Sequence, residues 1–251
     1  MTTPPILEVS HLSKNFGGVL AVHRVSFALR PGELLGIIGP NGSGKTTLVN
    51  LITRFVKPTS GKVMFKGHKI SHLPPYKIVR LGIARTFQMV KPFYQLPAYK
   101  NMIIPLYSPR MAQLAGGTYG DRNAVALDLL EEVGFERDAY VAYKVAGALP
   151  QGYLKRLELA KAIALQPELY ILDELFSGLS LAEVASIVPI IEKIRMAGKT
   201  IIMIEHRLKE LFRIADRVIV MNYGEKIAEG TADAVMANEA VKSAYLGTEA
   251  D

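Results

Sequence analysis

Short apolar runs bounded by glycine, proline and polar residues alternate with helical patterns along most of the chain. Residues 34–39 (LLGIIG) predict a buried strand, and a glycine-rich turn then leads into a predicted helix over 46–55. Further strands are predicted at 62–66, 169–172, 200–204 and 218–221. Strands that alternate with helices favour a parallel sheet with both faces covered, so the pattern predicts an α/β fold.

The middle of the chain has a different pattern. From residue 88 to about residue 165 strand signals become scarce, and the apolar residues of 122–133 recur at helical spacing. This change predicts a helical insertion between two parts of the sheet. Residues 181–197 also follow a helical pattern, but Pro189 lies inside it, and we expect a kink or a break at that point.

The composition limits the possible classes of protein. With 251 residues, 49% of them hydrophobic, the chain can bury an α/β core as one large domain or as a core with a subdomain. The formal net charge of +7 favours an anionic partner, either a nucleotide, a nucleic acid or a membrane surface. The sequence contains no cysteine, which excludes a disulfide framework and a thiolate metal site.

Neither a targeting segment nor a membrane span is evident. Residues 1–9 contain two prolines and lack the basic and apolar regions of a signal peptide. No stretch approaches the roughly 18 apolar residues of a membrane span. We therefore expect a soluble chain whose connection to a membrane, if it has one, is made by partner proteins.

The turn after the first apolar run is typical of a phosphate site. Residues 39–46 (GPNGSGKT) match the pattern G-x-x-x-x-G-K-[ST] between a strand and a helix, where main-chain N–H groups can surround phosphate oxygens. Lys45 is expected to reach the β- and γ-phosphates, and the Thr46 hydroxyl to bind Mg²⁺. The predicted nucleotide-binding residues are Gly39, Pro40, Asn41, Gly42, Ser43, Gly44, Lys45, Thr46 and Thr47. The alternative is a glycine turn followed by Lys-Thr by chance.

Two later strands end in residues that suit the same chemistry. Asp173 and Glu174 follow the run 169–172, at the end of a strand where an open α/β sheet places its ligands. Asp173 is expected to hold Mg²⁺ through water, and Glu174 to take a proton from an attacking water. The alternative is an acidic pair that caps the next helix. His206, at the end of the run 200–204, could contact the γ-phosphate, although a lone histidine is usually structural.

In this order, the phosphate loop, Gln88, Gly152, Asp173-Glu174 and His206 resemble the ATP-binding cassette family over nearly the whole chain. The resemblance implies a single ATPase domain over 1–251, with an N-terminal antiparallel β part. Its parallel-sheet core would comprise 1–88 and 166–251, with a helical subdomain at about 89–165. It also implies ATP and Mg²⁺ as cofactors. Two subunits would face each other head to tail, and each ATP would lie between the phosphate loop of one and the signature loop, usually LSGGQ, of the other.

The resemblance also assigns roles to single residues. Phe16 fits the aromatic residue that stacks on adenine, with a core aromatic as the alternative. Gln88 fits the glutamine that links Mg²⁺ and water to the helical insertion, and Gly152 fits the signature glycine. The implied catalytic residues are Glu174, His206, Lys45 and Gln88, and the implied metal ligands are Thr46, Gln88 and Asp173.

Several longer stretches narrow the resemblance. The segments GIARTFQ, RLELAKAIALQPELYILDE and NEAVKSAYLG together resemble the ATPases of branched-chain amino-acid importers, among whose relatives are importers of urea, short amides or aromatic acids. The implied partners are a second, identical or different ATPase, two membrane permease subunits and, indirectly, a substrate-binding protein, without nucleic acid. The implied location is the cytoplasmic side of the inner membrane, as a peripheral subunit. The alternatives are the ATPase of another system, such as a lipopolysaccharide-type exporter, and a weakly hydrolysing regulatory subunit.

The signature segment departs from the family. In residues 149–153 (LPQGY), Pro150 stands where serine is usual and Tyr153 where glutamine is usual. Leu175 replaces a proline, and Ser180 replaces an aspartate or asparagine. Because Pro150 has neither a hydroxyl nor an N–H, we expect a complete set of chemical groups with a weakened contact across the dimer.

Two other segments carry open expectations. Lys155 and Arg156 are expected to stay near the positive end of the helix after Gly152 and to add to its field, while Leu154, Leu157 and residues 161–164 form its apolar stripe. The aromatic-rich segment 91–107 is expected either to receive a short helix of the membrane subunit or to form ordinary subdomain core.

Overall fold

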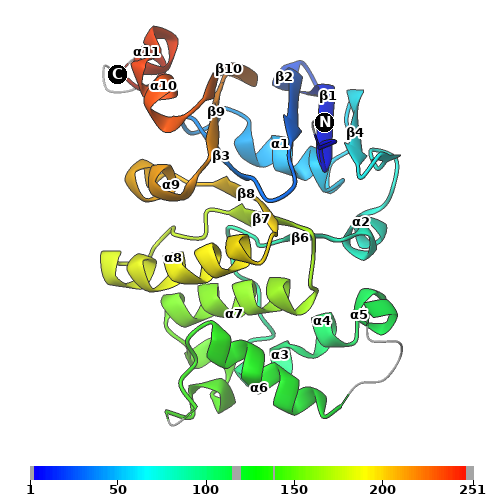
Figure 1. The fold of residues 1–251 in the computed structure, drawn as a ribbon, viewed down its shortest axis with the longest axis vertical. Helices are drawn as coiled ribbons and strands as arrows, with labels where there is room; N and C mark the ends of the chain where they lie inside the picture. The colour runs from blue at the N-terminus through cyan, green and yellow to red at the C-terminus, as the bar shows by residue number, and fades with distance from the viewer. Residues whose placement is uncertain (1–2, 115–119, 138, 247–251) are drawn as a thin grey trace. The chain divides into compact units, whose positions relative to one another are not determined.

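The computed structural model describes residues 3–114, 120–137 and 139–246 (Figure 1). The chain divides into two compact units, one formed by residues 1–78 and 198–251 and the other by residues 79–197. The helix α2 (Pro75–Leu81) lies where the chain passes from one unit to the other. The predicted boundaries of a core and a helical subdomain, near residues 88 and 165, stay a prediction.

The first unit begins with an antiparallel sheet in the order β2-β1-β4-β5. Its strands are β1 (Leu7–Phe16), β2 (Val19–Leu29), β4 (Ser60–Phe65) and β5 (His68–Lys69). Leu7 pairs with Leu29 on one side and with Phe65 on the other, and all three side chains are buried. This sheet confirms the antiparallel N-terminal part and the strand predicted at 62–66.

The same unit contains the parallel strands that position the phosphate loop. Strand β3 (Leu34–Ile38) pairs in parallel with β8 (Thr200–Ile204) and with β9 (Arg217–Asn222), and Ile37 lies opposite Ile204 and Ile219. Every residue of β3 and β8 is buried, as continuous apolar runs predict for strands covered on both faces. The remaining elements are α1 (Lys45–Ile52), α9 (Leu208–Ile214), β10 (Glu225–Gly230), α10 (Ala232–Ala237) and α11 (Glu239–Leu246).

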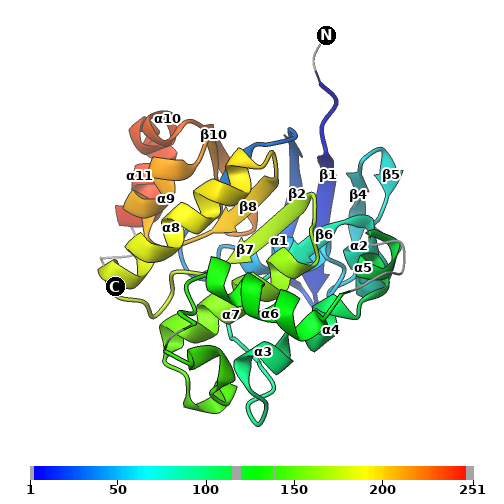
Figure 2. The same cartoon turned by 60° about the horizontal axis from the view of Figure 1, so that its bottom comes forward.

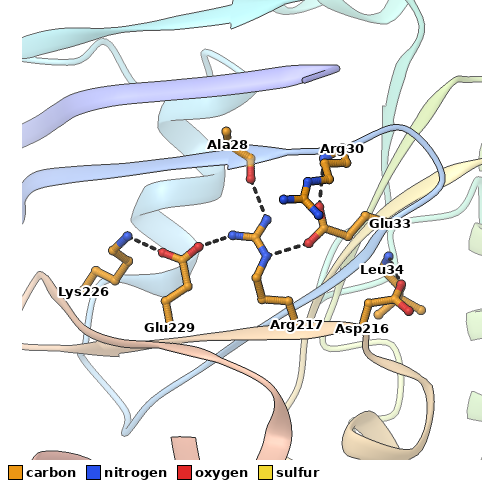
Figure 3. A network of polar contacts seen from close by, with 8 residues as sticks. All are labelled: Ala28, Arg30, Glu33, Leu34, Asp216, Arg217, Lys226 and Glu229. Atoms are coloured by element: carbon orange, nitrogen blue, oxygen red, sulfur yellow. Dashed lines mark hydrogen bonds and ion pairs between the residues drawn. The ribbon is translucent and has the colours of Figure 1, made fainter. Parts of the chain in front are cut away.

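A polar network lies at the other end of β3 and β9, away from the phosphate loop (Figure 3). The Arg217 guanidinium donates to Glu33 Oε1 at 2.6 Å and to the main-chain oxygen of Ala28 at 2.5 Å, and it pairs with the Glu229 carboxylate. Lys226 pairs with Glu229 as well and donates to the main-chain oxygen of Ser26 at 2.7 Å. The network therefore ties β2 to β9 and β10.

The second unit is mainly helical. Its described residues include two strands, β6 (Ile83–Arg85) and β7 (Leu169–Asp173), which are parallel and lie side by side. No strand occurs among the described residues between β6 and β7 in the sequence, which agrees with the scarcity of strand signals from residue 88 to about residue 165. The helices are α3 (Ala98–Asn101), α4 (Ile103–Leu106), α5 (Pro109–Leu114), α6 (Arg122–Glu132), α7 (Gln151–Ala164) and α8 (Leu181–Met196), with 3-10 turns at Val141–Tyr143 and Ala146–Ala148. Helices α6 and α7 pack side by side in both views of the fold (Figure 2).

Helix α8 runs through Pro189 without a break, so that part of the expectation is wrong, whereas the kink stays a prediction. Proline removes the hydrogen bond to the carbonyl four residues earlier, that of Ala185. Both residues are exposed, so water can satisfy that carbonyl, while the buried side chains of Val184, Ile187 and Ile191 hold the two halves of the helix in place.

Candidate active site

The phosphate loop connects β3 to α1 and depends on its glycines. Gly39, Gly42 and Gly44 have φ angles of 149°, 77° and 99°, which side chains strongly disfavour. A Cβ at Gly39 would lie 2.1 Å from the main-chain oxygen of Met221, and a Cβ at Gly44 would lie 2.4 Å from that of Ala21. Only glycine at these two positions lets the loop pack so closely on the neighbouring backbone.

The loop lysine is held by the loop itself. Lys45 is buried, and its ammonium group donates to the main-chain oxygens of Gly39 at 2.7 Å and Pro40 at 3.0 Å. The Ser43 hydroxyl is buried with no hydrogen-bond partner among the described residues. Lys45 begins helix α1, whose N-terminus has no side-chain cap. The loop thus holds an ammonium group, a buried hydroxyl and an uncapped helix end, all of which suit phosphate oxygens.

Several predicted site residues of the first unit are exposed. His206 follows β8 and is exposed, at the same edge of the parallel strands as the loop after β3. The Phe16 ring is 47% exposed and has the Lys14 ammonium 4.7 Å from its centre, so the alternative of a core aromatic is wrong. The Thr46 side chain is exposed at the start of α1.

Tyr245 contacts the phosphate loop, and the sequence analysis did not predict this contact. It lies in α11, and its hydroxyl forms a hydrogen bond with the main chain of Gly39. Burial raises the pKa of Tyr245, and this hydrogen bond lowers it in part. The one available signal was the segment NEAVKSAYLG, which we used only for the family resemblance.

The acidic pair lies at the end of β7 in the second unit. Asp173 Oδ2 forms a salt bridge with Arg85 Nη2 at 2.7 Å, and the two side chains are 1% and 6% exposed. The other oxygen, Asp173 Oδ1, is buried without a hydrogen-bond partner among the described residues. Arg85 was missed from the sequence, although it lies only three residues before Gln88.

Glu174 has an unusual backbone and several partners. Its φ angle of 49° places it in the left-handed region, which costs a non-glycine residue about 1–3 kcal/mol. Gln88 Nε2 donates to Glu174 Oε2 at 2.6 Å. The Lys155 ammonium donates to the main-chain oxygens of Glu174 at 2.9 Å and of Gln88 at 3.0 Å. The structure thus brings Glu174 and Gln88 together and adds Lys155 to them.

The buried position of Lys155 was not predicted from the sequence. Lys155 is 1% exposed, whereas Leu154, predicted for the apolar stripe, is only half-buried. The two carbonyl oxygens offset the cost of burying the lysine, because a buried ammonium group needs hydrogen-bond acceptors. Leu157 is buried, as predicted.

The signature segment begins α7. Pro150 occupies the N-cap position and supplies no side-chain hydrogen bond there. Gly152 is buried, and a Cβ at this position would lie 2.3 Å from Glu183 Oε1. Tyr153 packs on the Phe135 ring, with ring centres 5.1 Å apart in an edge-on arrangement.

Ser180 forms the N-cap of α8. Its hydroxyl accepts from Glu183 N at 3.2 Å, and Glu183 Oε2 accepts from Ser180 N at 2.8 Å, which completes a capping box. The main-chain and hydroxyl hydrogen bonds of Ser180 hold the pKa of Glu183 below its ordinary value. Because Ser180 caps this helix, the alternative role of Asp173 and Glu174 as its cap is wrong.

Each unit offers single oxygen donors that suit a magnesium ion. Among the described residues no group of three or more His, Cys, Asp or Glu gathers as a metal site. Mg²⁺ bound with a nucleotide needs only one or two protein ligands, because phosphate and water oxygens complete its shell. Taken singly, the unpartnered oxygen of Asp173 in the second unit and the exposed hydroxyl of Thr46 in the first unit are each an oxygen donor of the kind that Mg²⁺ binds.

Comparison with known proteins shows which family the chain resembles. Residues 22–177 match the family model of the ABC transporter, and residues 225–251 match the model "Branched-chain amino acid ATP-binding cassette transporter". The chain is 36% identical to the high-affinity branched-chain amino acid transport ATP-binding protein BraF of Pseudomonas aeruginosa, over 97% of this chain and 98% of BraF. LivG of Escherichia coli, named likewise, is similar to the same extent, with 36% identity over 97% of this chain and 98% of LivG. The lipopolysaccharide export system ATP-binding protein LptB of Haemophilus influenzae is 31% identical, over 97% of this chain and 98% of LptB.

Solved structures agree with this placement. The ADP conformation of MJ1267, an ATP-binding cassette of an ABC transporter, is 30% identical with a TM-score of 0.82, covering 98% of this chain and all of that one. In the described part of the chain, no helix has both the length and the apolar character needed to cross a bilayer. The chain belongs to the ABC transporter family, and it is one of the ATPases of that family.

Proposed function

We propose that this chain hydrolyses ATP to drive an importer of branched-chain amino acids, or of a related small substrate, through partner membrane subunits. The observation that carries this proposal is the match of residues 225–251 to a model specific to branched-chain amino-acid cassettes. The identities to BraF and LivG, higher than that to LptB, favour an importer over a lipopolysaccharide-type exporter.

ATP would lie on the phosphate loop with its adenine on the exposed Phe16 ring. Lys45 would exchange its two carbonyl partners for the β- and γ-phosphates, and His206 would approach the γ-phosphate from the end of β8. Glu174 would orient the attacking water and accept its proton, and Gln88, already bonded to that carboxylate, would help to align it. Asp173, Thr46 and Gln88 would hold Mg²⁺, which supplies positive charge to the phosphate oxygens.

The expected assembly is a head-to-tail dimer with a second, identical or different, ATPase. Gly152 and the N-terminus of α7 would then face the γ-phosphate of the ATP bound by the opposite subunit, with the helix dipole favouring that charge. Two permease subunits and, indirectly, a substrate-binding protein would complete the transporter, and the chain would lie at the cytoplasmic face of the inner membrane.

A surface in the second unit suits the permease contact. Phe93, Tyr94 and Leu96 are exposed, which argues against a role for these residues in the subdomain core. The buried amide of Asn101 donates to the main-chain oxygen of Pro97 at 3.0 Å and accepts from Phe93 N at 2.7 Å. This amide fixes the loop that presents the three apolar side chains, so we place the docking site for a short permease helix there.

The test is ATP hydrolysis by the full chain purified with its membrane partners. Glu174→Gln should lower the rate by at least about 100-fold, because general base catalysis typically contributes 10²–10⁴-fold. Glu136→Gln, the same change at an exposed position of the same unit, should leave the rate unchanged. An undiminished rate in Glu174→Gln would refute the assignment of the base. The ligand of the co-purified binding protein, identified by mass spectrometry, would test the substrate, and a lipid ligand would contradict it.

A further inference from the structure

Lys155 lies inside the second unit, one turn from the start of α7. Its side chain is among the largest that are fully buried, and its ammonium group bridges two main-chain oxygens that belong to different loops. One is the oxygen of Gln88, 67 residues away, and the other is that of Glu174, 19 residues away. Neither contact is needed to form α7, since a solvent-facing lysine would serve the helix as well.

The two oxygens belong to residues that already contact each other. Gln88 donates to the Glu174 carboxylate at 2.6 Å, so the three residues form a closed triangle of hydrogen bonds. Glu174 also has a left-handed backbone, with a φ angle of 49°, which surrounding contacts must maintain. The bond from Lys155 acts on the carbonyl of this strained residue and thereby helps to fix the direction of its carboxylate.

We propose that Lys155 is a positioning residue that links the signature end of α7 to the catalytic glutamate of its own chain. The inference rests on the proposed function, in which the N-terminus of α7 contacts the ATP held by the opposite subunit. A shift of α7 on that contact would move the ammonium group, and with it the backbones of Gln88 and Glu174. Nucleotide at one site of the dimer would thus set the geometry of the base at the other.

Single variants test the positioning role. Lys155→Met keeps the apolar stem and removes the donors, and kcat should fall about 10- to 100-fold, as expected for the loss of hydrogen bonds from a charged group. The KM for ATP should change less than about threefold, since Lys155 donates to the main chain of Gln88 and Glu174, which act on the attacking water in the proposed mechanism. Lys155→Arg, which keeps charged donors, should restore most of the rate. The control is Lys161→Met on the same helix, where the lysine pairs with Glu158 instead.

Mixed dimers test the link between sites. One chain carries Lys45→Ala, so that it holds no nucleotide, and the other chain is either wild-type or Lys155→Met. With a wild-type second chain, the rate per working site should fall below that of the wild-type dimer, because its α7 then faces an empty site. When the second chain carries Lys155→Met, the rate should be nearly the same whether the opposite site is empty or filled. A smaller effect of the empty site in the variant than in the wild-type chain measures the coupling energy that passes through Lys155.

The outcomes separate this inference from the proposed function. If Glu174→Gln abolishes hydrolysis but Lys155→Met behaves like Lys161→Met, the proposed function stands and the role of Lys155 is refuted. A loss of rate that Lys155→Arg does not rescue, with a thermal unfolding midpoint lowered to match, would show a merely structural lysine. If Lys155→Met does not fold, Lys155→Gln, which keeps a neutral donor, should show an intermediate kcat, and a wild-type kcat would overturn the inference.

Discussion

Replacement of Arg217 by methionine should destabilise the first unit measurably. The guanidinium donates to Glu33 and Ala28 and pairs with Glu229, and the Glu33 side chain is only 10% exposed (Figure 3). Removal of one partner from a buried ion pair costs about 3–5 kcal/mol, because the other charge is left without compensation. Arg217 itself is 23% exposed, so water would take over part of the interaction, and we expect a loss of about 2–3 kcal/mol in the free energy of unfolding.

Urea unfolding followed by circular dichroism measures this loss through the midpoint, provided that the slope of the transition is unchanged. The matched control is Arg137→Met. Arg137 also pairs with two carboxylates, those of Asp128 and Glu131, but it is 57% exposed, so its loss should cost less than about 1 kcal/mol. Equal losses in the two variants would refute the argument that burial decides the value of these pairs. Glu33→Gln combined with Arg217→Met should cost less than the sum of the single changes.

Three further outcomes are expected. Partial burial raises the pKa of Glu229, but the hydrogen bond and charge of Lys226 and the charge of Arg217 bring it below its ordinary value of 4.5. The ionised carboxylate therefore stabilises the fold fully above about pH 4.5, and this stabilisation is lost as the pH falls through the folded-state pKa. Glu229→Gln should flatten the acid side of a plot of urea midpoint against pH. Ser180→Ala removes the cap of α8 and should cost about 1 kcal/mol in the same assay, whereas an unchanged midpoint would contradict the capping box. Pro150→Ser should raise the ATPase rate of the assembled transporter, because a hydroxyl would restore a contact to the opposite nucleotide worth up to about 1.5–3 kcal/mol, and an equal or lower rate would contradict the weakened contact.

The sequence predicted the fold wherever its signal is local. The run LLGIIG and the loop GPNGSGKT are contiguous, so the strand, the turn and the helix could be assigned together, and β3 and α1 appear within a few residues of their predicted ends. The acidic pair was located for the same reason, since β7 ends at Asp173.

The missed contacts are those made over long distances along the chain. The partners of Lys155 lie on two loops 67 and 19 residues away, and no local sequence pattern predicts these contacts. A signal did exist in the helical spacing. Gly152, Lys155, Leu159 and Ala162 recur at intervals of three and four residues and are all buried, whereas the predicted apolar stripe ran through Leu154, Leu157 and residues 161–164. The sequence analysis considered Lys155 only for its charge near the start of the helix.

Pro189 shows that a local rule can also predict too much. The local rule against proline inside a helix was overridden by packing, because the neighbouring apolar side chains are buried and Ala185, whose carbonyl loses its partner, is an exposed residue. Propensity describes the isolated segment, and the buried face of α8 decided the outcome.

The closeness of Gly152 to Glu183 has an evolutionary consequence. A Cβ at Gly152 would lie 2.3 Å from the end of the Glu183 side chain, so a larger residue at the signature position requires that carboxylate to shift, independently of nucleotide. The two positions should therefore covary among relatives. A lineage that shortens the side chain at Glu183 gains room for alanine at Gly152, and a lineage that keeps the glutamate must move its carboxylate to accept the same change.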